Sequence, residues 1–185
     1  FRQSENNMAL VLGRLALHAR PDFPLGHFFL AEIFEGMKKF EDSMALYEGV
    51  DKASPISWEA RLRVAGNLAD LKRTDEAIAL FDALSKERPD RADPIFRKGN
   101  VLREKERFTE AVAAYDEAIK RLGPPEPTHW SYYYSRGMAL ERAKDYARAE
   151  VDLSRADLQG IDLANANLQN AVLTGARMPD NTVHP

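Results

Sequence analysis

The sequence predicts an all-α fold, a solenoid built from stacked helix pairs. Three kinds of residue recur at one interval and predict it. Small residues return every 34 positions, at Ala9, Ser43, Ala77 and Ala111, with Ala149 following after 38. Two prolines, Pro55 and Pro89, are also 34 residues apart, and each follows an expected helix, where proline stops helix growth. Apolar residues recur at the same interval as the small residues and the prolines. Such a period is typical of repeats that bury their apolar faces only against their neighbours.

Each repeat is expected to contain two helices, and the repeats start near residues 24, 58, 92 and 130. The first helix carries apolar residues at helical spacing, as in Leu30, Ala31 and Phe34. The second carries a small residue, a larger one four positions later and an apolar or small one after three more, all on one helical face. These triplets are Ser43/Tyr47/Val50, Ala77/Phe81/Leu84, Ala111/Tyr115/Ala118 and Ala149/Leu153/Ala156. The small member allows two helix backbones to approach closely.

The two ends of the array depart from this pattern. Residues 5–20 are expected to form a lone helix, because Pro21 extends the proline series one period earlier. Four extra residues between the third and fourth repeats, in the segment 123–127, explain why Ala149 comes late. The chain begins at Phe1 and not at methionine, so we expect a fragment or a processed form, with any signal peptide upstream.

Residues 5–157 resemble tetratricopeptide repeats of a bacterial type. The match is carried by Arg73-Thr-Asp-Glu-Ala-Ile-Ala-Leu80 and Arg107-Phe-Thr-Glu-Ala-Val-Ala-Ala-Tyr115. The resemblance implies that residues 1–157 form a right-handed superhelix whose concave face binds a peptide or a partner protein. It is compatible with the bacterial cytoplasm or periplasm, and the sequence leaves the oligomeric state open.

The tail changes period from 34 to five. Leucines recur at Leu153, Leu158, Leu163, Leu168 and Leu173. A step of five residues turns an α-helix by about 140°, so these leucines cannot share one helical face. The segment resembles the pentapeptide-repeat family, which implies a short right-handed β-helix coil over residues 158–180, or else an irregular tail. We expect helix through about Arg155, departure from helix near Gly160, and a disordered end at 181–185.

Composition narrows the possible functions. The chain has no cysteine, and its four histidines have neither metal-ligand nor catalytic spacing, so we expect no catalysis, no metal and no cofactor. A net charge of −3, with acidic and basic residues interspersed, argues against nucleic acid as a partner. No apolar run approaches the roughly 20 residues that span a bilayer, so direct membrane insertion is not expected.

The tetratricopeptide resemblance places certain first-helix positions on the concave face. They form three stripes: Phe28, Leu62, Phe96 and Tyr134; Glu32, Gly66, Asn100 and Met138; Glu35, Ala69, Arg103 and Glu141. From these we expect the partner-binding residues Phe28, Leu62, Phe96, Asn100, Arg103, Tyr134 and Met138. Aromatic residues at helical spacing are also typical of a core, and this second interpretation stays open for the aromatic stripe.

Three further functional hypotheses are compared with the sequence. Tetratricopeptide domains that clamp chaperone tails use lysine, asparagine and arginine, and only Asn100 and Arg103 fit that set, so this function is disfavoured. The alternative to a free-standing interaction scaffold is a regulatory or recruiting arm of a larger enzyme or envelope complex. The tail is too short and too sparsely charged for a β-helix that mimics nucleic acid.

Overall fold

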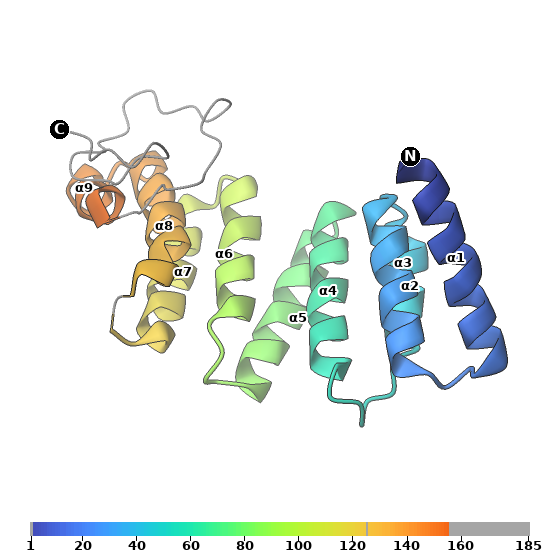
Figure 1. Ribbon diagram of the computed structural model, residues 1–185. Helices are drawn as coiled ribbons and strands as arrows, with labels where there is room; N and C mark the ends of the chain where they lie inside the picture. The colour runs from blue at the N-terminus through green and yellow to red at the C-terminus, as the bar shows by residue number, and fades with distance from the viewer. Residues whose placement is uncertain (1, 125, 156–185) are drawn as a thin grey trace. The chain divides into compact units, whose positions relative to one another are not determined.

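The computed structural model describes residues 2–124 and 126–155, and in these ranges the chain is helical, with one short 3-10 turn (Figure 1). The elements are α1 (Arg2–Ala19), α2 (Pro24–Gly36), α3 (Phe40–Glu48), α4 (Ser57–Asp70), α5 (Thr74–Glu87), α6 (Asp93–Glu104), α7 (Phe108–Leu122), η1 (Pro127–His129), α8 (Trp130–Arg142) and α9 (Tyr146–Arg155). The all-α fold class is confirmed. The segments expected as a pentapeptide-like coil (158–180) and a disordered end (181–185) lie outside the described residues.

The helices divide into two compact units, Phe1–Glu87 and Arg88–Pro185. In the first unit α1 packs on α2, and the pairs α2–α3 and α4–α5 follow. In the second unit the pairs are α6–α7 and α8–α9, and α7 also packs on α8. Each second helix therefore packs both on the first helix of its own pair and, within a unit, on the first helix of the next.

Small residues lie buried where the helices of a pair meet. Five of them have no exposed surface: Ala31, Ser43, Ala65, Ala77 and Ala111. In α6 the helices are so close that a Cβ placed on Gly99 would lie 2.6 Å from Cε1 of Tyr115. The large residue four positions after each small one is also buried, as predicted, at Tyr47, Phe81 and Tyr115. Small residues thus bring the helices together, and a large side chain fills the space beside them.

A buried hydrogen-bond chain connects three helices of the first unit. Ser43 on α3 donates to the carbonyl oxygen of Ala31 on α2 at 2.9 Å, and Asn67 on α4 donates to the Ser43 hydroxyl at 3.1 Å. Asn67 is only 1% exposed. A serine at this position can therefore replace alanine without leaving a buried polar group unpaired.

The turn inside each pair has one conformation in all four repeats. Its central residue adopts a left-handed backbone with φ between 58° and 65°; these residues are Lys38, Lys72, Glu106 and Lys144. The next amide reaches back across the helix end to the carbonyl of Phe34, Leu68, Leu102 or Leu140, each at 2.9 Å. This is the Schellman pattern, in which glycine is the usual left-handed residue. The four turns follow the repeat interval of the small residues.

An ion-pair network holds three helices of the second unit together. Arg136 on α8 donates two hydrogen bonds of 2.6 Å to Asp152 on α9, and a third of 2.7 Å to Asp116 on α7. The Asp152 side chain is 3% exposed, and the Arg136 side chain is 16% exposed. The buried negative charge of Asp152 is therefore balanced by the positive charge of Arg136.

The first helix packs on one side only among the described residues. Gly13 lies against Leu30 of α2, and Leu17 lies against Gly26 of the same helix. The opposite face of α1 is apolar too, and it is more than half exposed at Met8, Val11, Leu12 and Leu15. Ala9, Gly13 and Ala16, the equivalents of the buried triplets, are consequently only half-buried. No helix in the described ranges is long and apolar enough to cross a membrane.

We expect Lys72→Gly to raise the free energy of unfolding by about 0.5–1 kcal/mol. The left-handed backbone costs a lysine roughly 1–2 kcal/mol, and the greater freedom of glycine in the unfolded chain offsets part of the gain. Urea denaturation measures the change. The matched control is Ala79→Gly, at an exposed position within α5, which should lose about 1 kcal/mol. Equal losses in both variants would contradict the interpretation.

We expect Arg136→Leu to destabilise the second unit by roughly 3–5 kcal/mol, because it leaves the Asp152 carboxylate buried without a partner. The double variant Arg136→Leu/Asp152→Leu should recover most of this loss. Trp130 on α8 reports the unfolding by fluorescence in a Trp58→Phe background, because the chain has only these two tryptophans. A double variant as unstable as the single one would show that the pair is not the cause.

Candidate functional site

Two first helices of the second unit present half-buried side chains at helical spacing. Phe96, Asn100 and Arg103 follow one another along α6 at intervals of four and three, and Tyr134 and Met138 are four apart on α8. These five residues all belong to the predicted set. None of them is fully buried, so each retains surface that a partner can touch. We refer to them together as the α6–α8 face.

The two aromatic side chains of the α6–α8 face, Phe96 and Tyr134, each contact other rings. The ring of Phe96 lies with its centroid 4.2 Å from that of Tyr132 and 5.6 Å from that of Tyr115. Tyr134 lies beside Trp130, with centroids 6.3 Å apart. Such contacts hold aromatic side chains in fixed positions, which lowers the conformational entropy that these side chains lose when a partner binds. Phe96 therefore packs against other rings and also keeps exposed surface, so both interpretations of the aromatic stripe apply to it.

The polar residues of the same face, Asn100 and Arg103, form hydrogen bonds with the buried Tyr115. Its hydroxyl donates to Oδ1 of Asn100 at 2.8 Å and accepts a hydrogen bond from Nε of Arg103 at 3.3 Å. Burial raises the pKa of Tyr115, against the opposing effect of the Arg103 charge. The hydroxyl is consequently protonated at neutral pH and remains a donor to Asn100. The arginine is oriented through its Nε, which leaves its two terminal nitrogens for other contacts.

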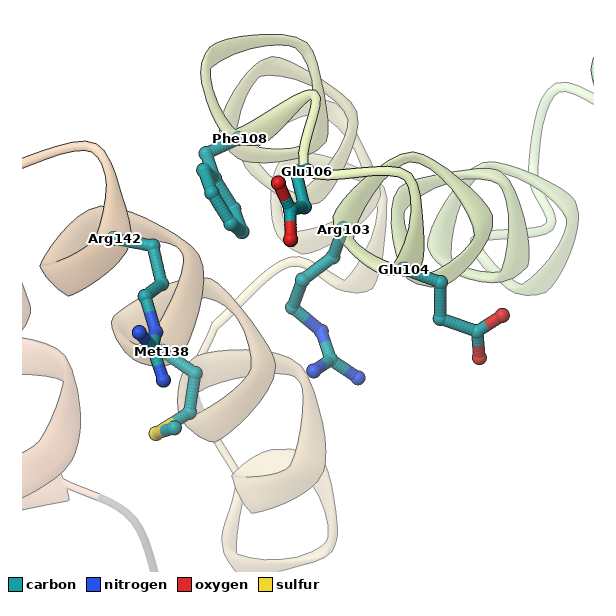
Figure 2. A pocket seen from close by; sticks show the side chains of 6 residues that line it. All are labelled: Arg103, Glu104, Glu106, Phe108, Met138 and Arg142. Atoms are coloured by element: carbon teal, nitrogen blue, oxygen red, sulfur yellow. The ribbon is translucent and has the colours of Figure 1, made fainter. Parts of the chain in front are cut away.

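A cavity of about 300 Å³ lies at one end of this face (Figure 2). It is lined by Arg103, Glu104, Glu106, Phe108, Met138 and Arg142. In Figure 2 the side chains of Arg103 on α6 and Arg142 on α8 extend in the same direction, whereas Glu104 points away from them. The lining thus combines two guanidinium groups, two carboxylates and two apolar side chains, Phe108 and Met138.

The first unit gives a different outcome for its two predicted residues. Phe28 is half-buried, and its ring packs edge-on against Tyr47 with centroids 5.3 Å apart. It belongs to the margin of a core cluster that includes Ala31. Leu62 has no exposed surface at all, so the prediction that it contacts a partner is wrong. A leucine without exposed area stabilises the helix stack through burial.

In the first repeat, carboxylates occupy the positions equivalent to Asn100 and Arg103, which are Glu32 and Glu35. The Tyr47 hydroxyl donates to Glu35 at 2.9 Å. Arg63 forms ion pairs with Glu35 at 3.4 Å, with Glu32 at 3.2 Å and with Glu59 at 3.5 Å. Burial, followed by the hydrogen bond to Glu35, raises the pKa of Tyr47 well above its ordinary value. Three carboxylates thus surround the single positive charge of Arg63, so this surface carries an excess of negative charge.

The predicted set leaves out five residues of the site: Tyr132, Glu104, Glu106, Phe108 and Arg142. Tyr132 stacks on Phe96, and Phe108 and Arg142 line the cavity. Stripes drawn at one residue per helical turn include neither Tyr132 nor Arg142, which lie beside the stripe positions Tyr134 and Glu141. The dense aromatic segment 130–134 was the available signal for Tyr132. In the described residues no group of three or more His, Asp or Glu is placed to hold a metal ion.

Two tetratricopeptide repeat families match the chain, one over residues 34–98 and the other over residues 96–162. The family of pentapeptide repeats, in eight copies, matches residues 149–180. Together the two tetratricopeptide matches extend from residue 34 to residue 162, which is more than half of the sequence. A search among curated proteins found no match.

Several solved structures share the fold. MamA has a TM-score of 0.67 and 17% identity, over 83% of this chain and 88% of that chain. YrrB, described as a TPR protein with an unusual peptide-binding site, has a TM-score of 0.59 and 14% identity, over 83% and 77%. The C-terminal part of a TPR repeat-containing protein from Cytophaga hutchinsonii has a TM-score of 0.68 and 16% identity, over 84% and 60%. At these identities the likeness concerns the fold alone.

We expect Gly99→Ala to destabilise the second unit by about 1–3 kcal/mol. The new Cβ would lie 2.6 Å and 2.8 Å from two ring carbons of Tyr115, and that ring has no exposed surface into which it could move. The matched control is Gly66→Ala in the middle of α4, where nothing lies within 4 Å of the new Cβ. It should gain about 1 kcal/mol from helix propensity. Urea denaturation of both variants tests this, and a stabilising Gly99→Ala would refute the close contact.

Proposed function

This chain is a tetratricopeptide-repeat protein, and from that family membership we propose that it is an interaction scaffold whose α6–α8 face binds a peptide segment of a partner protein. The observation that carries the proposal is the group of contacting rings at Phe96 and Tyr132. Phe96 also contacts the buried ring of Tyr115, yet neither Phe96 nor Tyr132 is fully buried. Fixed aromatic side chains with remaining exposed area are typical of the residues that dominate binding energy in interfaces.

The arrangement suits a peptide better than a small molecule. Phe96 and Tyr134 come from successive first helices and provide apolar area, while Asn100 and Arg103 offer polar groups about one and two turns further along α6. An extended segment or a helix can contact both kinds of group at once, because its side chains repeat over similar distances. The likeness to YrrB, whose description names a peptide-binding site, supports the same class of partner.

The proposal covers both functions that the sequence leaves open. A free-standing scaffold and a recruiting arm of a larger enzyme would each need a surface that holds a partner. Binding is therefore the property to measure first. Whether nucleic acid also binds stays a prediction from charge: the chain carries 26 basic and 29 acidic residues, so we expect no binding.

We expect Tyr134→Ala to weaken peptide binding by about tenfold or more, a loss of about 1.4 kcal/mol. Peptides are first selected from a random library on the full chain, and their affinities for each variant are then measured by fluorescence anisotropy. Phe96→Leu should weaken the same peptides while keeping much of the apolar volume. Circular dichroism shows whether each variant stays helical.

The matched control is Tyr146→Ala, which removes a tyrosine that is 62% exposed on α9 of the same unit. It should leave the affinity unchanged. Equal affinities for the native chain and the Tyr134→Ala variant, or equal losses at Tyr134 and Tyr146, would show that the α6–α8 face is not the binding surface.

A further inference from the structure

We propose that the cavity between α6 and α8 binds a carboxylate side chain of the partner peptide, held between the guanidinium groups of Arg103 and Arg142. The inference rests on the proposed peptide-binding function of the same face, and it adds the chemical class of the residue that is recognised. The cavity of about 300 Å³ has room for one acidic side chain together with its neighbouring backbone.

The first argument is that these two arginines form no ion pair with a carboxylate of the described residues. Elsewhere in the second unit arginines pair with acids, as Arg121 does with Glu117, Arg136 with Asp152 and Arg148 with Asp116. Within residues 88–124 and 126–155, no ion pair to an acid is found for Arg103 or for Arg142. The one hydrogen bond of the Arg103 side chain there goes to a neutral phenol, Tyr115. The guanidinium groups of Arg103 and Arg142 are thus not ion-paired within the described residues, and the opposing charges on the cavity lining are those of Glu104 and Glu106.

The second argument is that the repeat does not need a cation at this position. The residues equivalent to Arg103 in the other repeats are Glu35, Ala69 and Glu141. In the first repeat, Tyr47 donates to Glu35, and the fold is maintained with the opposite charge. The fold therefore does not require an arginine at this position.

The geometry of Arg103 is suited to a carboxylate. Its Nε is engaged by the Tyr115 hydroxyl at 3.3 Å, which orients the planar guanidinium group and leaves the terminal nitrogens available. Two parallel N–H groups can then donate to the two oxygens of one carboxylate. Arg142 supplies a second positive charge from α8, and Met138 and Phe108 give the methylene carbons an apolar wall.

Glu106 limits how strongly the cavity attracts an anion. It lies on the cavity lining, at the left-handed turn position where the other three repeats carry Lys38, Lys72 and Lys144. Its negative charge opposes that of a bound carboxylate. Removing this charge should therefore strengthen binding, whereas removing a charge that points away, at Glu104, should not.

The experiment uses the full chain and a synthetic peptide array. Each peptide has a background of leucine, tyrosine and serine and differs at one central position, which is Asp, Asn, phosphoserine or Lys. We expect the Asp peptides to bind at least about fivefold more tightly than the matched Asn peptides, with a preference that falls as salt is raised. Equal binding of Asp and Asn would overturn the inference. Phosphoserine binding tenfold tighter than Asp would overturn the carboxylate assignment in favour of phosphate.

Three variants locate the effect on the cavity. Arg103→Gln/Arg142→Gln should abolish the preference for Asp over Asn, measured as the ratio of the two affinities in that variant. Glu106→Gln should increase the preference about two- to fivefold, and Glu104→Gln should leave it unchanged. A preference that survives the double arginine variant would overturn the inference.

The two proposals fail in different ways. If Tyr134→Ala has no effect on any peptide, the α6–α8 face is not the binding surface and both proposals fall. If Tyr134→Ala weakens the peptides but Asp and Asn bind equally, peptide binding stands and the carboxylate site is refuted. A direct readout is titration of the ¹⁵N-labelled chain with N-acetyl-aspartate methylamide, in which the Nε–H signals of Arg103 and Arg142 should shift together and saturate. Unshifted signals would count against the site.

Discussion

The close approach of the two helices in each pair is the constraint on which the rest of the structure depends. It requires a small residue at the point of contact, and Ser43, Ala77 and Ala111 meet that requirement with no exposed surface. Because the helices are so close, a large ring from the second helix lies directly on the first, as Tyr115 does on Gly99. The position of that ring in turn fixes which groups reach the α6–α8 face.

The tyrosine hydroxyl connects the packed interior to the candidate site. Where the ring is Tyr115, its hydroxyl contacts Asn100 and Arg103, and where it is Tyr47, it contacts Glu35. Burial raises the pKa of both hydroxyl groups, so they remain donors at neutral pH. In the second repeat the ring is a phenylalanine, and the residue equivalent to Arg103 is alanine. In these three repeats, a charged residue thus occurs at the position equivalent to Arg103 where the buried ring has a hydroxyl group, and alanine occurs where it has none.

The 34-residue interval was sufficient to predict the helix pairs, because the small residues and the rings beside them are the packing constraint itself. It was less informative about exposure. Leu62 and Phe96 occupy equivalent positions, yet one is buried and the other half-exposed, since a first-helix stripe lies at the boundary between interior and solvent. The cavity was not predicted, because Phe108 and Arg142 reach it through side-chain directions that spacing along one stripe does not describe. The lysines in left-handed turns also escaped prediction, since glycine is the usual signal there.

The pairing of ring and surface residue has a consequence for how such repeats can be redesigned. Copying only Arg103 onto the second repeat would place its guanidinium group beside Phe81, a ring that has no oxygen to orient it. A functional transplant would therefore need two coordinated changes, Phe81→Tyr in the interior and Ala69→Arg on the surface. The unit of exchange between repeats is thus a buried residue and an exposed one taken together, although they lie 12 positions apart in the sequence.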